Sequence, residues 1–508
     1  MTSTTQSTPP PTGDATSAWP FRSVLVANRG EIAVRVLRTV RALGLEGLVV
    51  YHAQDRDSPA VRLADRAIEI EGATPVAAYL DAEQIVECAK RAGAGAIHPG
   101  YGFLSENADF ARRVAAAGIV FVGPTPEQID LMGDKVRARA FVEQAGFPVA
   151  PSAIEDDDPA SFEQRAAAVG FPLLIKPSAG GGGKGMRIVR DAAQLAPEIE
   201  RARSEARRYF GDGRLYVERY VENPRHIEVQ VLGDAHGAVV HYFERECSVQ
   251  RRFQKIVEET PSPALDAATR ARICETAAGI ARRAGYRNAG TVEFIYGAGE
   301  FYFLEMNTRL QVEHPVTEAV TGVDLVREQL RVAAGEPLGY AQSAVEVRGH
   351  AIEFRLYAED PARGFTPTTG PVLALRLPQG EGIRVDGGIA QGQQVSAAFD
   401  PMLAKLVVSA PDRAQALARA ERALGDFALL GCQTNAAFLR RLTRHPAFVA
   451  GEVHTGFLDA NPEIAAPPPH SPERLGRLLA VAALSTRRLT DAADAVPALH
   501  ASLGHWRN

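Results

Sequence analysis

A chain of 508 residues is too long for one hydrophobic core and predicts about three domains. Its 46% hydrophobic and 23% charged residues are typical of a soluble globular protein, and they exclude a mainly disordered, collagenous or membrane-spanning chain. The net charge of −5 excludes a general basic surface for nucleic acid. Four widely spaced cysteines without a CxxC pair indicate reduced cytoplasmic thiols rather than a disulfide framework or a zinc site.

The N-terminal part of the chain changes character near residue 21. Residues 1–20 are rich in Ser, Thr and Pro, and we expect a disordered tail that is neither a secretory signal nor a mitochondrial presequence. From Phe21 onward, short apolar strands alternate with helical patterns, which predicts a parallel α/β sheet. The expected strands are 24–27, 48–51, 96–98 and 120–122, and the expected helices are 32–43, 81–92 and 109–117.

The turn after the first strand, Asn28–Glu31, lacks the GxGxxG pattern of nicotinamide-type dinucleotide sites. One interpretation is that this sheet is a scaffold for the polar loop His98–Asn107. A second unit, from about 134 to 337, holds a glycine run and most polar motifs. A third unit begins near 345; its expected elements are strands 351–357, 372–377 and 403–408 and a helix over 412–424. Residues 465–470 predict a linker, and an amphipathic helix is expected over 473–489.

Lysine is scarce: only six of the 56 basic residues are lysines. A chain that uses arginine wherever any cation suffices keeps lysine where a compact charge on a thin stem is required. Chance explains Lys90, which lies on a helical stretch. Four other lysines fall within sharp local motifs and are candidate functional residues: Lys135, Lys176, Lys184 and Lys255.

The glycine-rich loop 178–185 lies between an expected strand at 173–176 and another at 186–189. It is not a Walker A loop, because Ser178 replaces the first glycine and Gly185 replaces the final Ser/Thr. Glycine amides can close on an anion without a Cβ in the way, so we interpret the loop as a flap over phosphates. A plain flexible hairpin is the alternative.

Residues 291–307 predict a β-hairpin that turns at 297–299 and sets Glu293 opposite Glu305, with Asn307 on the same face. Opposed carboxylates repel unless a cation lies between them, and hard oxygen ligands suit Mg²⁺ or Mn²⁺. Separate ion pairs with arginines are the alternative. The added amide of Asn307 favours the metal interpretation.

Polar residues continue beyond the hairpin with a period of two, at Glu305, Asn307, Arg309, Gln311 and Glu313. A straight strand would spread them over about 26 Å, so the chain must bend near Thr308 or serve two neighbouring subsites. Arg309 with Lys255 could hold a small planar anion, and Glu313 could act as a base.

Three weaker patterns remain open. The basic run Gln250–Lys255 is most simply a solvated face. His226 and Glu228 lie two residues apart and could bind a metal, although a hydrogen-bonded structural pair is the commoner reading. On the strand 350–356, Glu353 and Arg355 share a face and predict a structural ion pair.

Taken together, these motifs resemble the biotin carboxylase family of ATP-grasp enzymes. The matching segments run in family order over about residues 21–460: VANRGEIAVRV (26–36), IHPGYGFLSEN (97–107), FVGP (121–124), MGDK (132–135), AGGGGKGM (179–186), ENPRHIEVQ (222–230), RECSVQRRFQK (245–255), EMNTRLQVEHPVTE (305–318), HAIEFRLYAEDP (350–361) and FDPMLAKL (399–406). The combination is far more specific than any single motif.

The resemblance implies an α/β (α+β) fold with three domains. These would be a Rossmann-like domain at 21–133, an ATP-grasp domain at 134–337 with a mobile glycine-rich lid at about 150–225, and a β-rich C-terminal domain at 345–460. A linker and helical tail would occupy 461–508.

It also implies roles for individual residues. ATP would be bound by Lys135, Lys176, Gly182, Gly183, Glu218, Arg219, Tyr220, Val221, His226, Gln250, Phe253, Glu293 and Glu305. Mg²⁺ or Mn²⁺ would be held by Glu293, Glu305 and Asn307. Bicarbonate would be held by Lys255, Arg309, Gln311 and Val312. Glu313 would be the base and Arg355 would stabilise the biotin enolate. The family often has His at the position of Phe253, which removes a polar contact there and leaves packing against the nucleotide.

The implied reaction is ATP- and bicarbonate-dependent carboxylation of biotin through carboxyphosphate, the first half-reaction of an acyl-CoA carboxylase. Alternatives are another ATP-grasp carboxylase or ligase, and a non-catalytic homologue that only binds nucleotide. The presence of Lys255, Arg309, Glu313 and Arg355 argues against the second.

The implied partners are a biotin carboxyl carrier protein, a carboxyltransferase subunit and a second copy of the chain in a homodimer, without nucleic acid or membrane. We expect this chain to carry no biotin itself, because its last lysine, Lys405, lies within a predicted strand and not in an Ala-Met-Lys-Met context.

Overall fold

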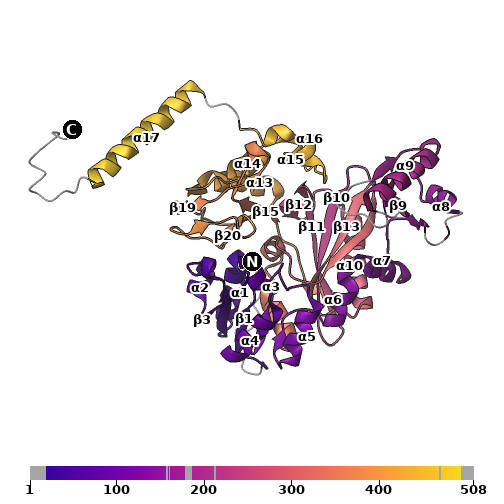
Figure 1. The fold of residues 1–508 in the computed structure, drawn as a ribbon, viewed down its shortest axis with the longest axis horizontal. Coiled ribbons are helices and arrows are strands. Elements are labelled where there is room, and N and C mark those ends of the chain that lie inside the picture. The colour runs from indigo at the N-terminus through magenta and orange to yellow at the C-terminus, as the bar shows by residue number, and fades with distance from the viewer. Residues whose placement is uncertain are drawn as a thin grey trace, which may run out of the picture. The chain divides into compact units, whose positions relative to one another are not determined.

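The computed structural model describes residues 19–155, 158, 161–177, 186–210, 213–467 and 471–493. It divides into two compact units, residues 1–464 and residues 465–508. The first unit contains three sheets that matter for function, and Figure 1 shows them with their helices. Predictions that concern the tail before Trp19 or the glycine run 178–185, including Gly182 and Gly183, lie outside the described residues.

The N-terminal sheet is five-stranded and parallel in the order β3-β2-β1-β4-β5. Its strands are β1 (Ser23–Val26), β2 (Glu46–Tyr51), β3 (Arg66–Glu69), β4 (Ala96–His98) and β5 (Val120–Phe121). Its helices are α1 (Gly30–Ala42), α2 (Pro59–Leu63), α3 (Pro75–Leu80), α4 (Ala82–Ala92), α5 (Ala108–Ala116) and α6 (Pro126–Gly133). All four expected strands and all three expected helices of this part are therefore confirmed, with shifts of one or two residues at most ends.

Local chemistry explains why these helices begin and end where they do. The Asp81 carboxylate caps α4 by accepting a hydrogen bond from the N–H of Gln84 at 2.9 Å. Gly93 ends the same helix in the left-handed conformation (φ 67°), which glycine adopts without a Cβ penalty. Trp19 departs from the prediction of a tail through residue 20, because it is buried and its indole N–H donates to Glu336 at 2.5 Å.

The central sheet is eight-stranded and antiparallel in the order β14-β13-β10-β11-β12-β15-β22-β20. Its strands are β10 (Arg225–Gly233), β11 (Val239–Arg251), β12 (Gln254–Thr260), β13 (Asn288–Gly297), β14 (Glu300–Asn307), β15 (His350–Tyr357), β20 (Ile383–Gly387) and β22 (Met402–Ala410). The helices of the central part are α7 (Lys135–Gln144), α10 (Ala267–Arg283), α11 (His314–Thr321) and α12 (Leu325–Ala333). The sheet passes without a break from the second expected unit into the third, since β12 pairs with β15.

A separate four-stranded antiparallel sheet carries the segments on either side of the glycine run. Its strands are β6 (Ser152–Ile154), β7 (Leu173–Pro177), β8 (Arg187–Val189) and β9 (Leu215–Arg219), and its helices are α8 (Phe162–Ala168) and α9 (Ala192–Phe210). β7 and β8 pair directly, which confirms that the glycine run connects two neighbouring strands. Residues such as Leu173, Ala202 and Leu215 form a core of their own, distinct from that of the central sheet.

Short strands and helices complete the C-terminal part of the first unit. The strands are β16 (Glu359–Asp360), β17 (Thr366–Pro367), β18 (Gly370–Pro371), β19 (Ala374–Arg376), β21 (Gln394–Val395) and β23 (Ala428–Leu430). The helices are α13 (Arg413–Asp426), α14 (Ala436–Leu442), α15 (Pro446–Val449) and α16 (Phe457–Ala460). In the second unit, α17 (Pro472–Ala493) confirms the expected amphipathic helix. No helix among the described residues is both long and apolar enough to span a membrane.

Candidate active site

The expected hairpin of β13 and β14 is present, with Glu293 and Glu305 as register partners. The carboxylate of Glu305 meets the ammonium of Lys135 at 2.6 Å. Glu293 is buried, and it accepts hydrogen bonds from the side-chain amide of Asn307 at 2.8 Å and from Lys255 at 2.9 Å. Each carboxylate therefore meets a lysine of its own, which corresponds to the alternative of separate ion pairs, with lysines in place of arginines. A metal ion shared by the two carboxylates stays a prediction.

Lys255 is the centre of a buried charge cluster. Its ammonium lies 2.9 Å from Glu293, 2.7 Å from Glu313 and 2.5 Å from Glu228. Burial would lower the pKa of Lys255, but the three carboxylates hold it well above its usual range. The basic run that contains Lys255 is consequently not a solvated face. It is the tip of the β11–β12 hairpin, and its lysine points inward.

The two-residue turn of that hairpin consists of Arg252 and Phe253, with φ angles of 49° and 66°. Both values match a type I′ turn, which favours Asn or Gly. A bulky residue in the left-handed region costs on the order of 1–3 kcal/mol, so this turn is strained for its sequence. Its geometry sets the register that pairs Gln250 with Lys255.

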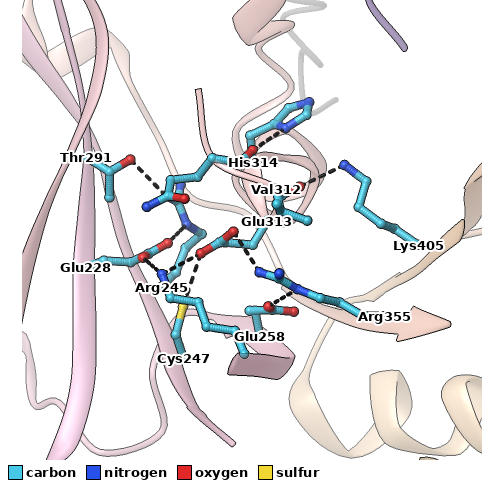
Figure 2. Close-up of polar contacts among 12 residues, drawn as sticks. Glu228, Arg245, Cys247, Glu258, Thr291, Val312, Glu313, His314, Arg355 and Lys405 are labelled. Carbon is cyan, nitrogen blue, oxygen red and sulfur yellow. Dashed lines mark hydrogen bonds and ion pairs between the residues drawn. The ribbon is translucent and has the colours of Figure 1, made fainter. Parts of the chain in front are cut away.

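Glu313 lies beside Arg355 (Figure 2), and its other carboxylate oxygen pairs with Lys255. Arg355 donates to Glu313 at 3.0 Å and to Glu258 at 2.6 Å, and all three side chains are buried. Burial would raise the pKa of Glu313, but Lys255, Arg355 and Arg245 hold it well below its usual range. Glu313 is therefore ionised in the folded protein, which is the form a general base requires.

The predicted structural pair of Glu353 with Arg355 is wrong. The guanidinium turns to Glu258 and Glu313 instead, and neither carboxylate oxygen of Glu353 has a hydrogen-bond partner. Alternation along β15 places Glu353 and Arg355 on one face. The guanidinium nevertheless pairs with carboxylates from other parts of the chain, Glu258 on β12 and Glu313 in the turn before α11. Burial, partly offset by Lys405, raises the pKa of Glu353 well above its usual range.

Arg245 supports this cluster from β11. It donates to Glu228 at 2.5 Å and to Gln230 at 3.0 Å, and it also reaches Thr291 and Thr317. His226, two residues before Glu228 on the same strand, lies 2.9 Å from Glu293. His226 and Glu228 thus each pair with other groups, and both interpretations of this pattern stay predictions. Ligand atoms of His226, Glu228 and Glu293 also lie within 4.8 Å of one another, a spacing that could hold a metal.

Arg309 lies where the chain bends after β14, as the spacing of polar residues requires. Its guanidinium donates to Gln311 at 2.7 Å, to Asn307 at 3.0 Å and to Glu106 at 2.7 Å. Glu106 belongs to the loop His98–Asn107, and it also accepts from the N–H of Thr308 at 3.1 Å. The loop that the parallel sheet carries thus fixes the bend, a role that no sequence motif identified for Glu106.

A cavity of about 760 Å³ joins most of these residues. The expected site residues in its lining are Lys135, His226, Gln250, Phe253, Lys255, Glu293, Glu305, Asn307, Arg309, Gln311, Val312 and Arg355. Glu313 is fully buried directly behind the lining. Lys176 and Glu218–Val221 do not line the cavity. Lys176, Glu218 and Arg219 lie on strands of the four-stranded sheet, where Lys176 contacts Glu218, and Tyr220 and Val221 directly follow β9.

The comparisons with known proteins agree with this geometry. Family models match in three consecutive parts: the biotin carboxylase N-terminal domain at residues 20–129, the carbamoyl-phosphate synthase L chain ATP-binding domain at 134–341, and the biotin carboxylase C-terminal domain at 353–460. The chain is 50% identical over 443 residues to a biotin carboxylase of Halalkalibacterium halodurans, covering 86% of this chain and 97% of the relative. It is 48% identical to the mitochondrial methylcrotonoyl-CoA carboxylase subunit alpha of Rattus norvegicus, but covers only 61% of that relative.

Solved structures of biotin carboxylases also match this chain. The biotin carboxylase domain dimer of Hydrogenobacter thermophilus 2-oxoglutarate carboxylase, in complex with MgADP, ADP and bicarbonate, matches with a TM-score of 0.79 at 43% identity, covering 88% of this chain and 99% of that chain. The biotin carboxylase subunit of a pyruvate carboxylase matches with a TM-score of 0.83 at 43% identity, covering 88% of this chain and all of that chain. The α/β fold and the ATP-grasp class are thereby confirmed. This chain belongs to the biotin carboxylase family, whose members are ATP-dependent carboxylases.

Proposed function

We propose that this chain carboxylates biotin N1 with ATP and bicarbonate, through carboxyphosphate, on a biotin carboxyl carrier protein or domain. The observation that carries the proposal is Glu313, a buried carboxylate held ionised between Lys255 and Arg355 behind a cavity that also presents Glu293 and Glu305. A base, a cation for the incoming anion and a pair of metal-binding carboxylates are the groups that the reaction needs.

The nucleotide end of the site is assigned to the side of the cavity that holds Lys135, Gln250 and Phe253. Lys176 on β7 and Glu218–Val221, at the end of β9 and just after it, would reach the nucleotide once the four-stranded sheet closes over it. Gly182 and Gly183 would do the same through their amides. Glu293 and Glu305 fit a hard divalent ion, because they are opposed on neighbouring strands with the Asn307 amide beside them. Mg²⁺ or Mn²⁺ there would neutralise phosphate charge.

Bicarbonate is assigned to Lys255, Arg309, Gln311 and Val312. Lys255 and Arg309 provide two cations on the same wall, and Gln311 donates its side-chain amide to Glu293 at 2.9 Å. Glu313 takes the proton of bicarbonate as the bicarbonate oxygen attacks the γ-phosphate of ATP, and the bond to the β-phosphate breaks with ADP as the leaving group. The bound anion weakens the field of Lys255 at Glu313, which raises the basicity of Glu313 at the moment the proton moves.

Arg355 is assigned to the biotin enolate. Its guanidinium reaches the cavity from β15, a strand that pairs with β12 next to Lys255. Carboxyphosphate breaks to CO₂ and phosphate, the phosphate removes the N1 proton of biotin, and Arg355 stabilises the enolate oxygen while CO₂ is captured. Closure of the site excludes water, which would otherwise hydrolyse carboxyphosphate.

The partners proposed are a biotin carboxyl carrier protein or domain, a carboxyltransferase and a second copy of the chain. The four cysteines are free thiols, which supports a reducing compartment, and we assign the cytoplasm.

The test is ATP cleavage measured with and without bicarbonate, and then with free biotin. We expect cleavage to depend on bicarbonate and to be stimulated by biotin, with Glu313→Gln abolishing both effects and retaining the fold. An ATPase indifferent to bicarbonate would refute the proposal. Streptavidin blotting after co-expression with a biotin ligase provides a second check. We expect no biotin on this chain, because none of its six lysines has an Ala-Met-Lys-Met context, and a stoichiometric biotin adduct would contradict this.

A further inference from the structure

Lys405 is a buried lysine that the mechanism above does not use. It lies on β22 with no exposed surface, and its ammonium donates to the carbonyl of Val312 at 2.7 Å (Figure 2). The carboxylate of Glu31, on α1 of the N-terminal domain, lies 3.3 Å from it. The ring of Tyr101 lies 5.7 Å from the same nitrogen. One ammonium thus touches the N-terminal domain and the turn that carries Glu313.

Lys405 lies between charged residues on both neighbouring strands. Lys405 is the register partner of Arg355 on β15 and of Asp386 on β20. Two cations directly opposite each other on neighbouring strands are destabilising unless each has its own anions. Arg355 has Glu258 and Glu313, and Lys405 has Glu31 with Asp386 on its other flank. A neutral side chain at position 405 would avoid the repulsion from Arg355, so the presence of a charged residue there needs an explanation.

That reason lies in the contact with Val312. β14 ends at Asn307 and α11 begins at His314, so Val312 belongs to the short connection between them. A buried carbonyl left without a donor is destabilising, and the hydrogen bond from Lys405 prevents this. A peptide unit is planar, so holding the carbonyl of Val312 toward Lys405 directs the N–H of Glu313 away from it. The contact therefore fixes the orientation of the peptide that joins Val312 to the catalytic Glu313.

We propose that Lys405 is a positioning residue for bicarbonate, acting through the Val312 carbonyl, with Glu31 as its counter-ion. The inference rests on the bicarbonate assignment made above. Its chemistry also fits the scarcity of lysine in this chain: a compact ammonium on a thin stem fills a fully buried position that a guanidinium fork would overfill.

The decisive variant is Lys405→Met, which keeps length and removes the charge. A charge-assisted hydrogen bond is worth about 1.5–3 kcal/mol, which corresponds to roughly a tenfold to hundredfold change in an equilibrium constant. We expect the KM for bicarbonate to rise by about tenfold or more while the KM for ATP changes by less than about twofold. Glu31→Gln, which leaves the Val312 contact in place, should give a smaller rise.

Arg413→Met is the matched control. It also replaces a mostly buried cation by methionine, and it breaks an ion pair with Glu259 at 2.7 Å without touching the cavity. We expect it to lower Tm and to leave the KM for bicarbonate unchanged. If Lys405→Met behaves like this control, with a lower Tm and an unchanged KM, Lys405 is merely structural and the inference is overturned.

A double variant keeps the proposal testable if Lys405→Met alone does not fold. Lys405→Met leaves Glu31 buried beside an apolar group, which is strongly destabilising, whereas removing both charges is often tolerated. We expect Glu31→Gln with Lys405→Met to regain Tm and to keep the raised KM for bicarbonate; recovery of the KM would contradict the role of Lys405.

The proposed function and the inference about Lys405 can fail separately. If the wild-type enzyme cleaves ATP without bicarbonate, the proposed function fails. If bicarbonate dependence holds and the double variant has a normal KM, only the inference about Lys405 fails.

Discussion

Glu293 and Glu305 are register partners on β13 and β14, and each meets a different lysine. Glu293 lies 2.9 Å from Lys255, inside the buried cluster, while Glu305 lies 2.6 Å from Lys135 near solvent. The two carboxylates are therefore not equivalent: one is buried beside Lys255, which we assign to bicarbonate, and the other lies beside Lys135, which we assign to the nucleotide.

For Glu305→Gln we expect the fold to persist and metal-dependent ATP cleavage to fall by about a hundredfold or more, as for loss of a preorganised charged group at a reacting centre. The side chain of Glu305 is 28% exposed, so Tm should change little. The measurement is the Mg²⁺ dependence of ATP cleavage. Retention of most turnover at ordinary Mg²⁺ would remove Glu305 from the metal site.

Arg355→Ala should separate the two halves of the reaction. We expect biotin carboxylation to fall by about a hundredfold and bicarbonate-dependent ATP cleavage to fall less, because Arg355 acts on the enolate and only secondarily on Glu313. Arg251→Ala is the control, since Arg251 pairs with Glu359 at 2.9 Å and does not line the cavity. Equal losses of both activities in Arg355→Ala would contradict a role specific to biotin.

His98 gives a prediction about pH. Burial, partly offset by a hydrogen bond with Gln329, lowers the pKa of His98 to about 4. Below about pH 6.5 the unfolded chain takes up a proton at this residue and the folded chain does not, so acid destabilises the fold until the pH falls below about 4. This one group should contribute a destabilisation of about 2 kcal/mol at pH 5.

His98→Gln should therefore have a lower Tm than the wild type at pH 7.5. Between pH 7.5 and pH 5, however, its Tm should fall by less than the Tm of the wild type. Thermal unfolding at a series of pH values measures this slope. His236→Gln, which changes an exposed histidine, is the control and should keep the wild-type slope. Parallel Tm curves for the wild type and His98→Gln would contradict the assignment.

Phe253 is 91% exposed at the rim of the cavity. Phe253→Ala should change the free energy of unfolding by no more than about 0.5 kcal/mol, as is usual for exposed positions. If the ring packs on the nucleotide, its loss should raise the KM for ATP by about twofold to tenfold, the range for an aromatic contact. Leu373→Ala, at another exposed apolar residue outside the cavity, is the control. An unchanged KM would mean that the ring does not touch the nucleotide.

Local signals explain what the sequence predicted well. The β13–β14 hairpin follows from glycines at its turn and from alternation along two adjacent strands, and both are short-range features. The opposition of Glu293 and Glu305 needs no other part of the chain. The bend before Glu313 follows from the length of a straight strand.

The failures are all non-local. The partner of Arg355 is Glu258 and not Glu353, because β12 pairs with β15 in a register that no motif reveals. Glu106 reaches Arg309 from a loop about 200 residues away along the chain. Lys405 contacts Val312, which lies 93 residues away along the chain, and its mostly apolar strand neighbours give no local sign of that contact.

The pairing of β12 with β15 also has a consequence for cooperativity. Residues 257–260 and 351–354 share one ladder, so Lys255 and Arg355 cannot separate unless that ladder opens. The four-stranded sheet of β6 to β9 has its own core and no strand in common with the ladder. Local opening should therefore expose the amides of β6 to β9 to hydrogen exchange well before those of β12 and β15, which would exchange only with unfolding of the whole central sheet.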